Sequence, residues 1–191
     1  GFNLHGKVVG VIGTGQIGIA FCKIMKGFGC RLLAYDIAES QALLDMGVEY
    51  LPMEEVFQQA DITSLHCPLN QSTKHMVNKG SLEQMKDGVM IINTSRGALI
   101  NTADAIEGLT KKKIGYLGID VYEQEENLFF EDLSESIIED DDILRLNSFP
   151  NVLITSHQAY FTKEAMDQIT VITLNNIRAF ENKHPLANEV I

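Results

Sequence analysis

A glycine-rich turn between a short apolar run and an amphipathic stretch constrains the fold of this chain more than any other feature. The run Val8–Ile12 is rich in β-branched residues and leads into Gly13, Gly15 and Gly18, which have the G-x-G-x-x-G spacing. A strand, a tight turn and a helix start in this order are typical of a dinucleotide-binding motif. Gly13 would allow the turn, Gly15 would admit a diphosphate to the backbone amides, and Gly18 would let the helix pack closely on the strand. The unpaired N–H groups of the new helix would favour the phosphates.

On spacing alone, a glycine-rich turn without a ligand is an equally good interpretation, and the next strand decides between the two. The run Arg31–Tyr35 is followed by Asp36, 18 residues after Gly18. A carboxylate there can accept the ribose hydroxyls of an adenosine and would repel a 2′-phosphate. No Arg or Lys stands between Ile37 and Leu51. The sequence therefore predicts NAD rather than NADP as the cofactor, although an acid that merely ends a strand would look the same.

The charge of the chain is mostly local. Of its 26 acidic residues, ten lie between residues 123 and 142, where no Lys or Arg occurs, and the other 16 nearly balance the 15 basic residues. This pattern gives no reason to expect a nucleic-acid partner. No apolar run approaches the ~20 residues that span a bilayer, so no membrane segment is expected either.

Cysteine usage and the N-terminus suggest a cytoplasmic protein. Cys22, Cys30 and Cys67 are odd in number and lack C-x-x-C spacing, which favours free thiols in a reducing compartment and no metal site. The first residues have neither the basic start nor the apolar core of a signal peptide. Because an initiator Met is also missing, we expect the chain to be part of a longer one.

Short apolar strands alternate with helical stretches along the whole chain. Near-continuous apolar strands are typical of a parallel sheet that is covered on both faces. The sequence therefore predicts an α/β fold, a Rossmann-type doubly wound parallel sheet with helices on both faces. Strands are expected near residues 8–12, 31–36, 48–51, 62–67, 89–94, 114–121 and 152–155. A last long helix is expected over residues 162–182, with a buried stripe formed by Met166, Ile169, Thr173, Ile177 and Phe180.

Three polar groups follow strands at the edge of the sheet where ligands bind. Arg96 follows the strand at 89–94, an acidic segment from Asp120 to Glu125 follows the next strand, and His157 follows the strand at 152–155. Reduction of a ketone needs a proton donor for the developing alkoxide, and His suits this near neutral pH. Glu125 would hold the imidazole in its protonated form. Arg96 would bind a substrate carboxylate by paired hydrogen bonds.

Each of these residues also has an ordinary structural interpretation. A single His at the end of a strand is more often a structural hydrogen-bonding residue, and a single Arg there is more often a surface residue. On spacing alone, Glu123 or Glu126 would serve as well as Glu125. Only their common place after parallel strands of a nucleotide-binding fold favours the catalytic interpretation.

Five motifs together resemble the D-2-hydroxyacid dehydrogenases, and the resemblance covers essentially the whole chain. Two further stretches, Leu128–Asp132 and His157–Tyr160, resemble the D-lactate dehydrogenase branch. The five motifs are the glycine turn Gly13–Gly18, the His66–Leu69 loop, Asn93–Leu99, Gly118–Glu125 and Ser156–Ala159.

The resemblance implies a catalytic set and a cofactor site. Arg96 would bind the substrate carboxylate and carbonyl, His157 would be the acid/base, and Glu125, rather than its neighbours, would be the partner of His157. Asp120 would lie near the nicotinamide carboxamide, and Thr73 stands where close lactate relatives often carry Asn. The residues implied at the cofactor are Gly13, Gly15, Gln16, Ile17, Gly18, Asp36, Cys67, Pro68, Thr73, Thr94 and Asp120.

The same resemblance implies a second domain that is built mainly from residues preceding this chain. We expect residues 1–183 to form the NAD-binding domain and residues 184–191 to return to a substrate domain. The implied activity is hydride transfer between NAD(H) and a small 2-keto or 2-hydroxy acid, pyruvate and D-lactate first, in a homodimer that forms through this domain. Alternatives are another member of the family, of the 2-hydroxyisocaproate or vancomycin-resistance type, and a non-enzymatic NADH sensor like the corepressors that share this fold.

Overall fold

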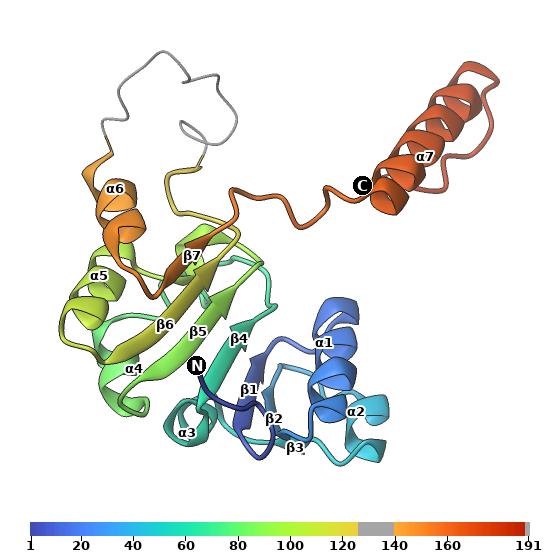
Figure 1. The fold of residues 1–191 in the computed structure, drawn as a ribbon. Helices are drawn as coiled ribbons and strands as arrows, with labels where there is room; N and C mark the ends of the chain where they lie inside the picture. The colour runs from blue at the N-terminus through green and yellow to red at the C-terminus, as the bar shows by residue number, and fades with distance from the viewer. Residues whose placement is uncertain (126–139, 190–191) are drawn as a thin grey trace. The chain divides into compact units, whose positions relative to one another are not determined.

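A seven-stranded, entirely parallel sheet forms the centre of the computed structural model, which describes residues 1–125 and 140–189. The strand order is β3-β2-β1-β4-β5-β6-β7, so the chain starts at the middle of the sheet and winds outward in both directions (Figure 1). The predicted Rossmann-type doubly wound sheet is confirmed. The strands are β1 (Val8–Ile12), β2 (Arg31–Tyr35), β3 (Glu49–Tyr50), β4 (Ile62–Leu65), β5 (Val89–Asn93), β6 (Ile114–Ile119) and β7 (Val152–Ile154).

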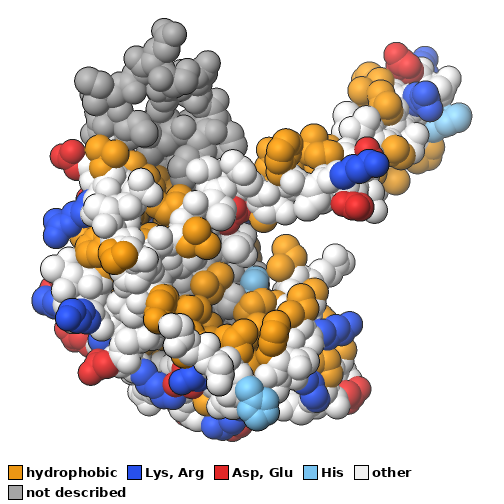
Figure 2. Space-filling view, in the orientation of Figure 1, with side chains coloured by type: hydrophobic (Ala, Val, Ile, Leu, Met, Phe, Trp, Pro, Cys, Tyr) orange, Lys and Arg blue, Asp and Glu red, His pale blue; other side chains and the backbone are white. Residues whose placement is uncertain are grey.

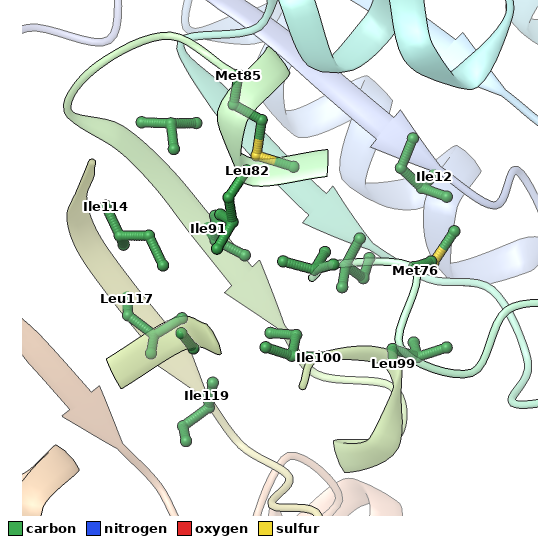
Figure 3. Close-up of a cluster of buried hydrophobic side chains, with 14 of the residues drawn as sticks. Ile12, Met76, Leu82, Met85, Ile91, Leu99, Ile100, Ile114, Leu117 and Ile119 are labelled. Atoms are coloured by element: carbon green, nitrogen blue, oxygen red, sulfur yellow. The ribbon is translucent and has the colours of Figure 1, made fainter. Parts of the chain in front are cut away.

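The helices of the sheet divide between two hydrophobic clusters. Helices α1 (Gln16–Gly27) and α2 (Gln41–Asp45) contribute Cys22, Met25 and Leu43 to the cluster that contains Val9 and Val11. The larger cluster, part of which is shown in Figure 3, includes Ile91, Ile114 and Leu117 of the sheet. The helices that contribute to it are α3 (Met53–Gln59), α4 (Lys79–Gln84), α5 (Thr102–Thr110) and α6 (Asp141–Ser148).

The helices cover the two faces of the sheet unequally. The apolar strands predicted burial on both faces, and β4 is buried at every position. In β6 and β7, however, Tyr116 is 41% exposed and Leu153 is 66% exposed. An apolar strand sequence therefore predicts that both faces of the sheet can be buried, but it does not predict which segment covers each face.

The chain divides into two compact units, Gly1–Ser156 and His157–Ile191, and the second contains helix α7 (Lys163–Glu181). The helix is where the sequence predicts it, but its predicted stripe, which includes Thr173, is not buried in the described structure. Figure 2 shows hydrophobic side chains on the visible surface of α7. Met166, Ile169, Ile177 and Phe180 are 37%, 46%, 50% and 74% exposed. The amphipathic pattern correctly predicts a helix with an apolar face and is wrong about its burial among the described residues of the second unit.

Helix α6 occupies a segment in which the sequence analysis recognises only a run of acidic residues. Helix α6 begins after Asp140, whose carboxylate accepts hydrogen bonds from the backbone N–H groups of Asp142 and Ile143, each at 3.0 Å. Ile143 and Leu146 bury its apolar side. A carboxylate at the N-cap is a strong helix start, and here the surrounding acidic run obscures it. Across the described parts of the chain, no helix is both long and apolar enough to cross a membrane.

Candidate active site and cofactor site

The glycine turn packs tightly on one side and is open on the other. Gly13 has φ +95°, and a Cβ there would lie 2.5 Å from the backbone nitrogen of Cys67. A Cβ on Gly18 would lie 2.1 Å from the carbonyl oxygen of Gly13, whereas nothing lies within 4 Å of a Cβ on Gly15. The turn therefore needs glycine at its two packed positions, and it leaves space beside Gly15 where Gln16 begins helix α1. This geometry fits a diphosphate against the helix N-terminus.

Asp36 is held at the end of β2 by Thr14. The backbone N–H and the hydroxyl of Thr14 both donate to Oδ2 of Asp36, the hydroxyl at 3.0 Å. Burial raises the pKa of Asp36, but the hydrogen bonds from Thr14 and from the amides of Ala38 and Ile37 more than offset it, so the pKa lies below its ordinary value. Asp36 is therefore a charged acceptor at neutral pH, next to an Ile37 side chain that is 97% exposed.

The loop after β4 is tied to the turn after β5. The Ser95 hydroxyl donates to the carbonyl oxygen of Cys67 at 2.7 Å. Within the loop, the Thr73 hydroxyl donates to the carbonyl oxygen of Pro68, also at 2.7 Å. Burial raises the pKa of the Cys67 thiol, so Cys67 is a neutral group in this loop. These hydrogen bonds hold Cys67, Pro68 and Thr73 in place, three residues that are predicted to contact the cofactor. Their contact with the cofactor stays a prediction.

His66 is a neutral structural histidine in the same loop. Its Nε2 lies 2.9 Å from the Ser64 hydroxyl, and its ring centroid lies 5.0 Å from that of Phe21 on α1. Burial lowers the pKa of His66 from 6.5 to about 4. The imidazole therefore stays uncharged beside the glycine turn at neutral pH.

Protonation of His66 is expected to cost about 2 kcal/mol of unfolding free energy between pH 7 and pH 5. The unfolded chain takes up this proton near pH 6.5, while the folded chain resists it down to about pH 4. This part of the stability is therefore complete above pH 6.5 and is lost as the pH falls. Urea unfolding at the two pH values should show a smaller loss for His66→Gln. Equal losses in both proteins would contradict the assignment.

Asn93 organises the turn that carries Arg96. Its buried side chain donates to the carbonyl oxygen of Arg96 at 2.9 Å and accepts from the N–H of Ser95 at 3.1 Å. Arg96 itself is exposed, as is Thr94. Asn93 is not among the residues predicted for the site, although an Asn at the end of a strand, followed by a turn, is a recognisable signal.

The Arg96 turn packs directly on the segment that carries Glu125. A Cβ on Gly97 would lie 2.1 Å from the carbonyl carbon and oxygen of Tyr122 and 2.5 Å from the backbone nitrogen of Glu123. Backbone therefore meets backbone here, which only glycine permits. The structure thus places the loops after β5 and β6 against each other, as the topology predicts.

The two described glutamates of the acidic segment have different partners. The backbone N–H of Tyr122 donates to Oε2 of Glu125 at 2.9 Å. Glu123 instead pairs with His75, and Oε1 of Glu123 lies 2.6 Å from Nε2 of His75. Oε2 of Glu123 accepts a hydrogen bond from the Thr102 hydroxyl at 3.2 Å. Glu123 is therefore tied to the His75 and Thr102 side chains, and the choice of Glu125 as the partner of His157 stays a prediction. Glu126 and the Leu128–Asp132 stretch lie outside the described residues.

Asp120 and His157 complete the predicted set. Asp120 is buried, its N–H donates to the carbonyl oxygen of Asn93 at 2.9 Å, and the Thr155 hydroxyl donates to its Oδ1. His157 is the first residue of the second unit. It and Ser156 have φ values of +53° and +50°, which are uncommon outside glycine and cluster at functional sites. The role of His157 stays a prediction.

Known proteins match this chain in sequence and in structure. The D-lactate dehydrogenase of Escherichia coli is 51% identical over 191 residues, which are 100% of this chain and 58% of that protein. The pyruvate reductase of Chlamydomonas reinhardtii has a TM-score of 0.95 at 43% identity and covers 98% of this chain and 57% of its own. The D-lactate dehydrogenase of Aquifex aeolicus, solved with NAD and lactic acid, has a TM-score of 0.86 at 34% identity, over 93% of this chain and 54% of its own.

The chain therefore spans little more than half the length of the relatives that it matches. The family model for the D-isomer specific 2-hydroxyacid dehydrogenase, NAD binding domain, matches residues 1–159. The match includes the glycine turn, Asp36 and the Arg96 turn. This chain belongs to the D-isomer specific 2-hydroxyacid dehydrogenases and carries their NAD-binding domain.

Proposed function

We propose that the complete protein containing this chain reduces a small 2-keto acid, pyruvate first, to its D-2-hydroxy acid with NADH. The observation that carries the proposal is the contact of Gly97 with the Tyr122–Glu123 peptide. Through this contact, the turn that carries Arg96 lies against the segment that carries Glu125, at one edge of the sheet. Arg96 is a cation suited to a substrate carboxylate, and Glu125 is the proposed orienting group. That edge is where ligands bind in an open α/β sheet.

The residues present fit the cofactor. The open space at Gly15, beside the start of α1, suits the diphosphate, and the Asp36 carboxylate suits the adenosine ribose. When bound, NADH supplies the hydride for the keto carbon. We assign the remaining contacts to the backbone and side chains of Gly13, Gln16, Ile17, Gly18, Cys67, Pro68, Thr73, Thr94 and Asp120.

Three side chains would bind the substrate, donate the proton and orient the proton donor. Arg96 would hold the carboxylate of the keto acid and polarise its carbonyl through the guanidinium fork. His157 would donate the proton that the reduced carbonyl oxygen takes up. Glu125, held by the Tyr122 N–H, would orient the imidazole.

The reaction is tested with the complete enzyme, NADH and a panel of pyruvate, branched-chain and aromatic 2-keto acids. Fastest turnover of pyruvate to D-lactate, identified by chiral chromatography, would support the proposal. A preference for a branched or aromatic acid would move the enzyme to another branch of the family. NADH binding without any turnover would instead favour a non-enzymatic NADH sensor.

Replacing Asp36 with alanine is expected to narrow the difference in affinity between NADH and NADPH. A 2′-phosphate beside the Asp36 carboxylate places two like charges together, which costs several kcal/mol. The wild-type chain should therefore bind NADH about 10²-fold more tightly than NADPH. In Asp36→Ala the ratio of the two dissociation constants should fall below about tenfold. Fluorescence titration of the chain measures both constants, and Asp45→Ala, an exposed acid of α2, is the control. Equal affinities in the wild-type chain would refute the assignment.

The location of the protein and its oligomeric state also belong to the proposal. We place the protein in the cytoplasm, which agrees with the free thiols of Cys22, Cys30 and Cys67. We propose a homodimer through this domain, and Ile24 of α1 and Phe28 at its C-cap, 59% and 52% exposed, support a protein contact. A monomeric mass by light scattering would exclude it.

The domain boundary is proposed near Ser156 rather than after residue 183. Both the first compact unit and the family match end there, at residues 156 and 159. The exposed apolar side of α7 agrees with a helix that packs in the substrate domain, together with residues 184–191.

A further inference from the structure

A chain of directed hydrogen bonds ends at the Asp36 carboxylate. The Ser40 N–H donates to the Tyr50 hydroxyl oxygen at 2.9 Å, and the Tyr50 hydroxyl donates to Oγ1 of Thr14 at 3.0 Å. Thr14 donates in turn to Oδ2 of Asp36 at 3.0 Å. Ser40 is the N-cap of α2, Tyr50 lies in β3, Thr14 lies in the turn after β1, and Asp36 directly follows β2. The three strands are neighbours in the sheet (Figure 1).

The direction of this chain is fixed by what each group can do. A backbone N–H only donates, an ionised carboxylate only accepts, and each hydroxyl has a single hydrogen. Because the Asp36 carboxylate can only accept, the single hydrogen of the Thr14 hydroxyl is directed to Asp36. The Tyr50 hydroxyl must then donate to Thr14, while its oxygen accepts from the Ser40 N–H. One arrangement of hydrogens satisfies all four groups.

The arrangement leaves the two oxygens of Asp36 unequal. Oδ2 accepts both the N–H and the hydroxyl of Thr14, whereas the Ala38 N–H donates to Oδ1 at a long 3.4 Å. Since a carboxylate oxygen accepts about two hydrogen bonds, Oδ2 is filled and Oδ1 retains capacity. Ribose hydroxyls would therefore meet Oδ1, on a carboxylate that cannot rotate without breaking the bonds of Thr14.

We propose that Thr14 and Tyr50 are positioning residues that fix Asp36 and so set how strongly NAD is preferred over NADP. The inference rests on the proposed role of Asp36 at the ribose. A carboxylate held in place cannot turn away from a 2′-phosphate, and no Lys or Arg between Ile37 and Leu51 offsets the repulsion. Thr14 is buried, with 5% of its surface exposed, so water does not readily replace its hydroxyl bonds.

The test is the ratio of NADPH to NADH dissociation constants, measured on the chain by fluorescence titration. Tyr50→Phe and Thr14→Val should each lower the ratio about 3- to 10-fold, the equivalent of one net hydrogen bond. Thr14→Ser keeps the hydroxyl and should retain the wild-type ratio. The double variant Thr14→Val/Tyr50→Phe should go no further than Thr14→Val, because both changes break one chain of bonds.

Tyr116→Phe, which removes a hydroxyl from β6, is the matched control and should leave the ratio unchanged. Thermal unfolding without cofactor monitors folding, and Tyr50→Phe remains informative if Thr14→Val does not fold. A wild-type preference for NADH with the same ratio in Tyr50→Phe and Thr14→Val would overturn the inference and leave the role of Asp36 intact. A wild-type chain without any preference would overturn both.

Discussion

Replacing His157 with glutamine in the complete enzyme is expected to lower kcat for pyruvate reduction by about 10²–10⁴-fold, the usual contribution of general acid–base catalysis. Glutamine keeps a hydrogen-bond donor of similar reach, but it cannot release a proton to the oxygen of the reduced carbonyl. KM for pyruvate should change much less, because Arg96 carries the binding of the carboxylate. The loss of NADH absorbance over a range of pyruvate concentrations separates the two parameters.

His184→Gln is the matched control, since it makes the same substitution in the same compact unit, after the end of α7. Its kcat should equal that of the wild-type enzyme. A His157→Gln enzyme that keeps more than about a tenth of the wild-type kcat would show that another group supplies the proton. In that case the positive φ of His157 would report only a tight turn.

The parts of the fold that could be predicted are those that local sequence determines. All seven strands lie where apolar runs predict them, because β-branched residues in short runs bounded by turns have few other structures. Helix α6 was missed because Asp140, its N-cap, stands within a long acidic run. The burial of α7 was wrong for a different reason. The pattern of Ile169 and Phe180 specifies an apolar face, but its cover is not among the described residues of the second unit.

The site divides in the same way. Gly13, Gly18 and Asp36 could be found because the motif requires them at fixed spacing. Tyr50 could not be found, because its place beside Thr14 depends on the register that pairs Ala34 of β2 with Tyr50. Asn93 does carry a local signal, because it ends a buried strand and precedes a turn. The choice of Glu125 over Glu123 rests on the family resemblance, because both carboxylates have hydrogen-bond partners in the structure.

Replacing Gly97 with alanine is expected to lower both the stability of the protein and its kcat/KM for the keto acid. The new methyl group would lie 2.1 Å from the carbonyl carbon and oxygen of Tyr122, and backbone atoms cannot give way as a flexible side chain does. Overpacking of this kind costs about 1–3 kcal/mol of unfolding free energy. The Arg96 turn and the Glu125 segment must then move apart, and a misplacement near 1 Å can cost about 10²-fold in rate.

The position of the clash makes this prediction selective. Gly97 touches the loop after β6, near Thr94 and Asp120, whereas the glycine turn and Asp36 follow β1 and β2, so the dissociation constant for NADH should change less than tenfold, within about 1.4 kcal/mol. Gly27→Ala is the matched control, because a Cβ there has nothing within 4 Å and lies at the end of helix α1. It should keep both full activity and full stability. If Gly97→Ala had the same free energy of unfolding as Gly27→Ala and kept its kcat/KM, the loops after β5 and β6 would not need their close contact. Arg96 and Glu125 would then be positioned independently. If it lost stability and kept kcat/KM, the contact would stabilise the domain without placing the catalytic groups.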